Sequence, residues 1–369
     1  MKKILLCIPT LHGGGAERVF KYIIEYLDEA EYQIQLVLLQ NSTDLTSLFH
    51  ERGVVVHNLK CRLPLAFFKL PLLIRKEKPD IVLSTICYMN IVTGFCSWLL
   101  KSSNSVFIAR ESGIPSIRVQ YTKTFWNSPW FYKLAYKQLD CVICQSKDMA
   151  REVHELYKVP SELIFTISNP VDINFVRSQA SRNSPLSFSK SMINILAVGR
   201  LHPQKGYDLL IQALARTTKK NVHLHILGTG GSFDQLTILV ENLGLSDRVT
   251  FYGYVNNPYP FMRNADLFAI SSIAEGFPNS LLEALALGCP SIAFNGIGGT
   301  KELIEQDVNG SLVELGNIDL LASEIDRCSS ALFDRKRIAS KIAIRYDVFT
   351  IIKIYESVFL RTISRKQFH

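Results

Sequence analysis

The sequence of 369 residues lacks an apolar run long enough to cross a bilayer. Its longest apolar stretch, from Tyr88 to Leu100, is shorter than the roughly 20 residues that a membrane-spanning helix needs. The first residues imitate a signal peptide, because Lys2 and Lys3 precede apolar residues 4–9, but the apolar part is short and residues 12–18 make a poor cleavage region. We therefore expect a protein that is not integral to a membrane and that begins with a buried strand.

The sequence also offers little for disulfides or metal ions. Its eight cysteines are scattered, and several lie inside apolar runs, where cysteine behaves as a small hydrophobic residue. Cys141 and Cys144 form a single C-x-x-C motif that is accompanied by neither a second pair nor a histidine cluster, so a zinc site is not expected. This cysteine usage favours a reducing, cytoplasmic location. We expect neither a metal site nor a cofactor.

What the sequence does contain is sufficient for a globular fold. At 47% apolar and 20% charged residues the chain can bury a full core, and its length favours two domains. Its 20 glycines and 14 prolines are ordinary numbers, which excludes collagen-like and low-complexity repeats.

The excess of positive charge is concentrated in two segments of the first half. The net charge is +8, and residues 60–78 and 101–137 each carry six basic residues against one acid, Glu77 or Glu111. The second segment is also rich in aromatic residues between Tyr121 and Tyr136, a combination that suits an anionic membrane surface. The alternative is that the rings belong to the core and the cations to a solvated face. Nucleic acid is not expected as a partner, because no recognised binding module surrounds these charges.

Short apolar strands alternate with helical patterns through both halves of the sequence, which is typical of parallel sheets covered by helices. In the first half the predicted strands are residues 3–9, 34–39, 54–57, 81–85, 106–109 and 141–144, with a helix over 16–27. The pattern restarts after Asn169-Pro170-Val171-Asp172, and residues 178–191 are predicted to be a polar linker. In the second half the predicted strands are residues 193–198, 222–227, 249–252, 267–270 and 291–294, with a helix over 207–215.

This pattern predicts an α/β protein with two Rossmann-like, doubly wound domains that face one another. The first comprises residues 1–173 and the second residues 190–346. Ligands of such sheets bind outside the carboxyl ends of the strands, so we expect the site in the cleft between the domains.

The most informative motif is Ser-Ser-Ile-Ala-Glu-Gly-Phe-Pro-Asn-Ser-Leu-Leu-Glu-Ala-Leu-Ala, residues 271–286. Ser280 to Leu287 has helical character, so Glu275 falls in the loop before a helix and Glu283 about one turn inside it. Backbone N–H groups at a helix N-terminus favour anionic phosphate. The carboxylate inside the helix can accept hydrogen bonds from a ribose diol, and the loop carboxylate can bind hydroxyls of a second sugar. Acids near a helix start are also common simply as favourable partners of its dipole.

Two basic residues follow the first strand of the second half, in Gly199-Arg200-Leu-His-Pro-Gln-Lys205-Gly206. Arg200 and Lys205, on either side of a turn, can neutralise a diphosphate and stabilise negative charge on a leaving group without a metal. Each is unspecific by itself, because surface Arg and Lys are common. Glycine turns at 228–231 and 13–15 allow the backbone to approach a nucleotide, which is again a weak signal alone.

In this order, the motifs resemble glycosyltransferase family 4, the retaining nucleotide-sugar transferases of GT-B fold. The resemblance spans about residues 1–350 and rests on Gly14–Arg18, Asn169–Asp172, Gly199–Gly206, Gly228–Gly230 and Glu275–Glu283. The last block is the most specific. The opening Gly-Gly-Ala-Glu-Arg is similar to bacterial members that extend polyprenyl-diphosphate-linked oligosaccharides. Residues 347–369 resemble the family's C-terminal helix, which crosses back onto the first domain.

The resemblance implies roles for these residues. Arg200 and Lys205 would bind the donor diphosphate. Glu283 would bind the nucleotide ribose, and Glu275 the sugar hydroxyls near the reacting carbon. Glu275, Arg200 and Lys205 together would form the catalytic group. The other donor-binding residues would be Gly14, Gly15, Gly199, Gly228, Gly230, Gly276, Phe277, Pro278, Asn279, Ser280 and Leu281.

The chain departs from the family at one place on the acceptor side. Many members carry a histidine after the fourth or fifth strand of the first domain, near the transferred sugar, whereas this chain has Ile-Ala-Arg-Glu-Ser-Gly at 108–113. Arg110 and Glu111 are the candidates for that place. His12, beside the glycine loop, is a further candidate, although a loop histidine is more often simply solvated.

Two other functions are less compatible with the sequence. A nicotinamide-dependent oxidoreductase or sugar epimerase needs G-x-G-x-x-G and an acid at the end of the second strand, but that strand ends Leu38-Leu39-Gln40. A transferase-like subunit that only binds would be expected to lack one of the charged residues at 200, 205, 275 and 283, and all are present.

The function that we expect is retaining transfer of a hexose or N-acetylhexosamine from a nucleotide sugar, with a UDP-sugar favoured by the resemblance and no metal required. The basic and aromatic first half favours a lipid-linked saccharide as acceptor. The protein would then be peripheral on the inner face of a bacterial membrane, in surface polysaccharide assembly such as O-antigen or capsule synthesis. A soluble acceptor is the alternative.

Overall fold

The structure is a computed structural model. It describes residues 1–11, 14–40, 52–121, 128–182 and 188–367, except for the side chains of residues 119–121. The contacts within the chain divide it into two compact units. The first consists of Met1–Pro170 together with Val348–His369, and the second of Val171–Asp347. No helix among the described residues is long and apolar enough to span a membrane.

The first unit is built on a parallel sheet whose described strands run in the order β3-β2-β1-β4-β5-β6-β7. The strands are β1 (Lys2–Ile8), β2 (Tyr32–Leu38), β3 (Val55–Asn58), β4 (Ile81–Thr85), β5 (Val106–Arg110), β6 (Cys141–Cys144) and β7 (Ile164–Thr166). The helices are α1 (Gly15–Tyr26), α3 (Leu63–Glu77), α4 (Cys87–Leu99), α5 (Pro115–Tyr121), α6 (Pro129–Tyr136), α7 (Lys147–Tyr157) and α16 (Val348–Gln367).

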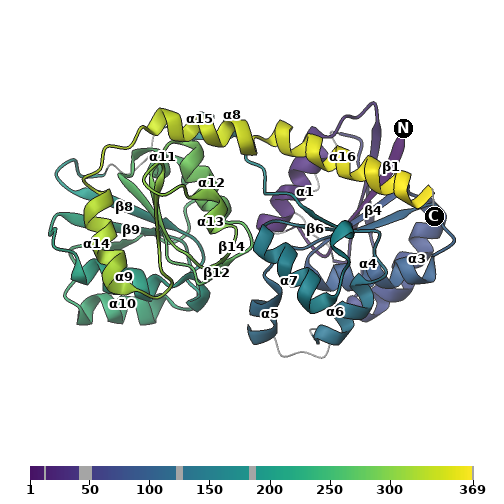
Figure 1. Cartoon of the computed structure of the whole chain (residues 1–369), viewed down its shortest axis with the longest axis horizontal. Helices are drawn as coiled ribbons and strands as arrows, with labels where there is room; N and C mark the ends of the chain where they lie inside the picture. Colours follow the sequence, from purple (N-terminus) through teal and green to yellow (C-terminus); the bar gives the residue numbers. More distant parts are fainter. Residues whose placement is uncertain (12–13, 41–51, 122–127, 183–187, 368–369) are drawn as a thin grey trace. The chain divides into compact units, whose positions relative to one another are not determined.

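Both faces of this sheet are apolar, which explains its nearly continuous hydrophobic strands. Ile4, Leu6 and Ile8 of β1 share a core with α1 and α16. Leu5 and Cys7 are equally buried and, by the alternation of strand side chains, face the opposite side. That side is covered by α3, α4, α6 and α7, which lie across the sheet from α16 (Figure 1).

The second unit contains a parallel sheet whose described strands run in the order β10-β9-β8-β11-β13-β15. The strands are β8 (Ile193–Val198), β9 (Val222–Leu227), β10 (Val249–Phe251), β11 (Leu267–Ile270), β13 (Ser291–Phe294) and β15 (Gly310–Val313), with β12 (Ala274–Glu275) and β14 (Ile297–Gly298) forming a small separate pair. The helices are α8 (Ile173–Ala180), α9 (Tyr207–Arg216), α10 (Phe233–Asn242), α11 (Tyr259–Asn264), α12 (Asn279–Ala286), α13 (Thr300–Leu303), α14 (Ile318–Cys328) and α15 (Arg335–Tyr346).

Two cores cover the faces of the second sheet. One lies between the sheet and α9, α10 and α14, and the other between the sheet and α8, α11, α12 and α15. Figure 1 shows these two groups of helices on opposite sides of the strands. Because the helices cover the faces, the carboxyl edge of the sheet is left to the loops that carry the sequence motifs.

Each strand predicted from the sequence is present, with ends that differ by at most two residues. Strands β7 and β15 were not predicted, and neither was the pair β12 and β14. β7 is three residues long and only partly buried, so it carries no apolar run that distinguishes it from a loop.

The units divide a few residues away from the predicted boundaries. Residues 171–173, expected at the end of the first domain, and residues 174–180, expected between the two domains, belong to the second unit. There, the apolar face of α8, Ile173, Val176 and Ala180, is buried in the second core. Val171 N donates to Tyr346 O at 2.9 Å. This hydrogen bond joins the two ends of the second unit, and the chain returns to the first unit with α16.

Candidate active site

The strand order of the second unit reverses at β8. The chain runs outward from β8 through β9 to β10 and then returns to the other side of β8 as β11. The loops after β8 and β11 therefore begin side by side at the carboxyl edge of the sheet. Parallel α/β sheets bind ligands at such switch points. The two most informative sequence motifs, residues 199–206 and 271–286, meet here.

Backbone contacts hold the loop after β8 against the loop after β9. Gly199 N donates to Leu227 O at 3.0 Å, and Leu201 N donates to Thr229 O at 2.9 Å. Gly228 has a φ of +145°, and a Cβ there would lie 1.9 Å from the carbonyl oxygen of Gly199. Glycine is therefore required at 228 by the packing of two loops of the site against each other.

Lys205 and Glu275 form an ion pair at the switch point. Lys205 Nζ donates to Glu275 Oε1 at 2.5 Å, and Ser272 Oγ donates to the same oxygen at 2.7 Å. The two charged side chains are 26% and 15% exposed, so the pair is partly desolvated and electrostatically stronger than one in open water. A cation and a carboxylate in this position can exchange their mutual contact for phosphate and hydroxyl groups of a ligand.

The turn that carries Lys205 is fixed by its neighbours. Gly206 has a φ of +60°, and a Cβ there would lie 2.2 Å from the carbonyl oxygen of Ser271. Ser271 Oγ donates to Lys205 O at 2.8 Å, and Gln204 Nε2 donates to Ala274 O at 2.8 Å. The loop after β8 is thereby attached to the loop after β11, and Lys205 is held beside Glu275.

Arg200 lies in the same loop and is exposed. Its guanidinium makes no hydrogen bond or ion pair with another residue that the structure describes. The loop after β8 thus carries two cations in different states, Lys205 paired with a carboxylate and Arg200 directed to solvent.

A small cavity of ≈ 10 Å³ lies at the ion pair, lined among others by Lys205, Glu275 and Ser280. Tyr207 also lines it. Burial, and next the negative charge of Glu275, raise the pKa of Tyr207 well above its ordinary value. The Tyr207 hydroxyl therefore stays protonated and is a hydrogen-bond donor throughout the physiological range.

The loop that carries Glu275 is supported by a second glycine-rich loop that was not among the predicted site residues. β12, which contains Glu275, pairs with β14. Gly299 N donates to Glu275 O at 3.0 Å, and a Cβ at Gly299 would lie 2.5 Å from the ring of Phe277. Phe277 is itself buried and packs on Tyr346, with ring centroids 5.7 Å apart. The sequence signal was present in Asn-Gly-Ile-Gly-Gly at 295–299.

Helix α12 starts at Asn279, with Pro278 as its N-cap. The first backbone N–H groups of a helix have no partner within it, which makes this end suitable for phosphate. Glu283 lies one turn inside and is only 6% exposed. Its Oε1 accepts a hydrogen bond from the Tyr259 hydroxyl at 3.4 Å, so Tyr259 is a further residue that the sequence did not indicate.

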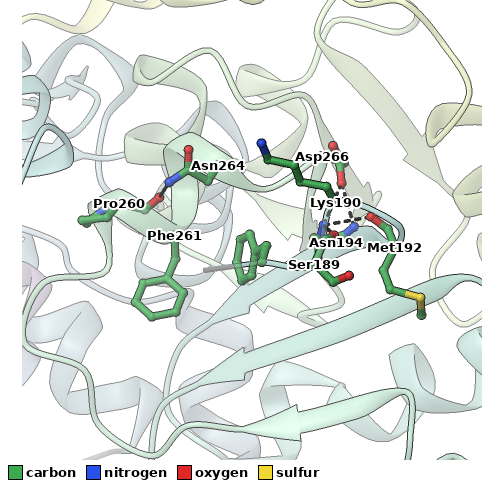
Figure 2. A pocket seen from close by; sticks show the side chains of 9 residues that line it. Ser189, Lys190, Met192, Asn194, Pro260, Phe261, Asn264 and Asp266 are labelled. Carbon is green, nitrogen blue, oxygen red and sulfur yellow. Dashed lines mark hydrogen bonds between the residues drawn. The ribbon is translucent and has the colours of Figure 1, made fainter. Parts of the chain in front are cut away.

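A larger cavity of ≈ 450 Å³ lies at the opposite, amino edge of the second sheet (Figure 2). Asn194 Nδ2 donates there to Asp266 Oδ2 at 3.2 Å and to the carbonyl oxygens of Ser189 and Met192. These polar groups satisfy one another, and the cavity is remote from the switch point. Although this cavity is larger, it lies at the wrong edge of the sheet for ligand binding and is not the candidate active site.

The first unit has a switch point of its own, because its strand order reverses at β1. After β1, Gly14 is the N-cap of α1 and Gly15 its first residue, and both are exposed. After β4, Ile86 has a φ of +68°, a strained conformation for a β-branched residue and one that is typical of functional loops. The predicted His12 lies outside the described residues.

Arg110, predicted on the acceptor side, is an interior residue of the first unit. Its Nη2 donates to Asn169 Oδ1 at 2.5 Å and its Nε donates to the Tyr355 hydroxyl at 3.0 Å. The side chain is completely buried and links β5 to α16. Its burial favours a structural role over contact with an acceptor.

Glu111 is also completely buried. Its Oε2 accepts from the Tyr136 hydroxyl at 2.7 Å, and its Oε1 is paired with Arg118. The guanidinium of Arg118 lies over the Tyr132 ring, 5.1 Å from its centroid. Burial, and next the charge of Glu111, raise the pKa of Tyr136 well above its ordinary value, so this cluster is a neutral phenol beside an ion pair. This arrangement also favours a structural role.

The described residues contain no group of three or more His, Cys, Asp and Glu side chains that could hold a metal ion.

Two family models match the chain, "Glycosyltransferase Family 4" over residues 13–175 and "Glycosyl transferases group 1" over residues 181–342. A relative from Campylobacter jejuni, N-acetylgalactosamine-N,N'-diacetylbacillosaminyl-diphospho-undecaprenol 4-alpha-N-acetylgalactosaminyltransferase, is 28% identical over 96% of this chain and 97% of its own. The lipopolysaccharide core biosynthesis glycosyltransferase LpsE of Rhizobium meliloti is 24% identical over 89% of both chains.

Solved structures have the same fold. A glycosyltransferase from Rickettsia africae aligns with a TM-score of 0.80 at 18% identity, over 98% of both chains. Anabaena HepE in complex with UDP aligns with a TM-score of 0.78 at 23% identity, over 97% of this chain and 99% of its own.

The fold and the motifs at its second switch point thus define a GT-B protein with two Rossmann-like parallel-sheet domains. Together with the two family models, they show that this chain belongs to glycosyltransferase family 4 and is a glycosyltransferase.

Proposed function

We propose that this enzyme transfers a sugar from a UDP-sugar to a polyprenyl-diphosphate-linked saccharide with retention of anomeric configuration. The observation that carries the proposal is the Lys205–Glu275 ion pair at the switch point of the second unit. A diphosphate requires cations and backbone N–H donors, and a sugar requires a carboxylate that accepts from its hydroxyls. The loops after β8 and β11 contain both.

The donor is held by four charged side chains. Arg200 and Lys205 neutralise the diphosphate, together with the N-terminus of α12. Glu283 accepts hydrogen bonds from the ribose hydroxyls, and the Tyr259 hydroxyl orients its carboxylate. Glu275 binds hydroxyls of the transferred sugar. UDP is favoured as the nucleotide because HepE, which has the same fold, is described in complex with UDP.

The anomeric configuration is retained when the acceptor hydroxyl attacks the anomeric carbon from the same side as that from which UDP leaves. The acceptor hydroxyl oxygen forms a bond to the anomeric carbon while the bond from that carbon to the UDP phosphate oxygen breaks. The hydroxyl proton passes to the departing phosphate oxygen, so charge and protons balance. Arg200 and Lys205 stabilise the negative charge that develops on UDP, which makes a metal unnecessary for this step.

The acceptor is proposed from the relatives and from the surface of the first unit. The name of the Campylobacter jejuni relative specifies a diphospho-undecaprenol saccharide, and LpsE acts in lipopolysaccharide core biosynthesis. The basic segments 60–78 and 101–137 suit an anionic membrane surface, and α3 exposes Leu65, Phe68 and Leu72. We place the enzyme at the inner face of the cytoplasmic membrane as a peripheral protein.

A soluble acceptor is the second candidate. A relative from Bacillus anthracis, N-acetyl-alpha-D-glucosaminyl L-malate synthase, is 30% identical over 52% of this chain. Its name shows that related transferases act on a small acid. The lipid-linked acceptor is preferred because the Campylobacter jejuni relative matches nearly the whole chain, including the first unit.

The proposal is tested by calorimetric titration of the purified protein with UDP, GDP, ADP and NAD in metal-free buffer. Selective UDP binding that is lost in Glu283→Ala supports the donor assignment. Binding of NAD, or of no nucleotide, contradicts it. Product analysis with a UDP-sugar and a polyprenyl-diphosphate-linked saccharide then tests the acceptor, and an inverted anomeric configuration would contradict the retaining step.

A further inference from the structure

A groove lined by aromatic side chains lies between α3, α4 and α6 of the first unit. Its volume is ≈ 430 Å³, which is in the range of sites for small organic molecules. Phe67, Phe95, Trp98, Phe131 and Leu134 line it, and among its described lining residues Gln138 has the one polar side chain.

The groove has a tightly packed floor and an open mouth. A Cβ at Gly94 would lie 2.3 Å from the carbonyl oxygen of Ala135, so α4 and α6 approach each other more closely here than any side chain would permit. Phe67 and Phe95 stand edge to face, with ring centroids 5.3 Å apart. Trp98 is half exposed. The rings are therefore held in place while part of their surface faces solvent.

The helices around the groove expose more large apolar side chains than an ordinary protein surface does. Leu65, Phe68 and Leu72 of α3 are exposed, as are Trp130 and Leu134 of α6. Exposed large apolar side chains that gather on neighbouring helices mark sites for a ligand, a partner or a membrane.

The charges of the three helices are almost entirely positive. α4 contains no charged residue, α6 contains only Lys133, and Lys101 and Lys137 follow these helices. The single acid of α3, Glu77, accepts from Gln35 and pairs with Lys3. The groove thus favours a ligand with an apolar body and an anionic head.

We propose that this groove binds the isoprenoid chain of the polyprenyl-diphosphate-linked acceptor, next to its diphosphate. A hydrocarbon chain leaves no polar group unpaired in an apolar groove, whereas a peptide backbone would. Lys101 and Lys137, which are close in sequence to the lining residues Trp98 and Gln138, attract the diphosphate. The assignment rests on the proposed function, because that function supplies the polyprenyl chain and the diphosphate.

The test is calorimetric binding of isopentenyl, geranyl, farnesyl and geranylgeranyl monophosphates, which share one head group and differ in chain length. Each isoprene unit that enters the groove should tighten binding by at least about tenfold until the groove is full. The double variant Trp98→Gln with Leu134→Gln should bind all four alike. Its matched control, Leu99→Gln with Leu156→Gln, changes two equally apolar and similarly exposed residues outside the groove and should keep the dependence on chain length.

Affinity that does not depend on chain length in the unaltered protein overturns the proposal, and so does an unchanged dependence in the groove variant. Equal binding of hexadecyl and geranylgeranyl phosphates would instead assign the groove to acyl chains of membrane lipids, against the isoprenoid. These measurements require no sugar transfer. Chain-length-dependent binding without transfer to any polyprenyl-linked acceptor would contradict the proposed function, while showing that the groove itself binds an isoprenoid chain.

Discussion

Lys205 Nζ lies 2.5 Å from Glu275 Oε1, which joins two residues 70 positions apart in the sequence. The loops after β8 and β11 meet in this contact. The order of the sheet reverses at β8, and parallel α/β sheets bind their ligands at such a switch point. The ion pair lies at this point.

The first prediction concerns this pair. Lys205→Met removes the cation but keeps most of its unbranched apolar stem, so UDP affinity should fall about 10- to 100-fold, the usual effect of losing a charge-assisted contact. Glu275→Gln should leave UDP affinity within about threefold and reduce kcat for sugar transfer by at least about tenfold. Titration calorimetry and initial rates separate the two effects. Lys336→Met, an exposed residue of α15, is the control. Unchanged UDP affinity and unchanged rates in both site variants would contradict the assignment of the donor site to the second unit.

The second prediction separates ribose from phosphate recognition. Glu283→Gln should weaken UDP binding about tenfold or more but leave inorganic diphosphate binding unchanged, because its carboxylate is assigned to the ribose. Tyr259→Phe should have a smaller effect in the same direction. The exposed Glu241→Gln on α10 is the matched control. An equal loss for UDP and diphosphate would show that Glu283 acts through the structure of α12 instead.

The third prediction concerns the packing of the two glycine loops. Gly228→Ala should lower the free energy of unfolding by more than about 2 kcal/mol, because its Cβ would collide with the carbonyl oxygen of Gly199 at a positive φ. Gly231→Ala, three residues away and with no described atom within 4 Å of the added Cβ, should change it by less than about 0.5 kcal/mol. Urea unfolding of both variants is the measurement. Equal stability would contradict the packing role.

The fourth prediction is a pH dependence of stability. Burial, and next the neighbouring His223, lower the pKa of His225 to about 4. The His225 ring contacts the Tyr252 hydroxyl at 2.9 Å and Asn194 Oδ1 at 3.1 Å.

The unfolded chain protonates His225 below about pH 6.5 and the folded chain only below about 4. Stability should therefore fall as the pH drops through this range, by about 2 kcal/mol between pH 7 and pH 5 through this residue. The free energy of unfolding is measured with urea at pH 7 and pH 5. The difference between the two pH values should be about 2 kcal/mol smaller in His225→Gln than in the unaltered protein. His154→Gln should retain the full difference, and a retained dependence in His225→Gln would contradict the assignment.

Much of the fold follows from local pattern. Buried parallel strands are short apolar runs, so strands such as β8 and β11 are recognisable from their residues alone. The helix start at α12 is likewise marked by Pro278 and Asn279. The three-residue β7 and the two-residue pair β12 and β14 lack such a pattern, since pairing with distant strands decides them.

Arg110 shows where sequence reasoning about a site reaches its limit. Its position after a strand made it a candidate for acceptor contact. Its hydrogen-bond partners Asn169 and Tyr355 are 59 and 245 residues away, and the guanidinium is completely buried in the packed unit. No local pattern contains such partners.

The sequence by itself determined the alternation of strands and helices, the two-domain organisation, and the charged residues at 200, 205, 275 and 283 with their family. These are properties of neighbouring residues, which are readable along the chain. Only the tertiary structure decided that Lys205 pairs with Glu275, that Arg110 lies inside, and that α3, α4 and α6 leave an aromatic groove open. Each of these depends on contacts between residues far apart in the chain, because burial and pairing are set by the whole packed unit.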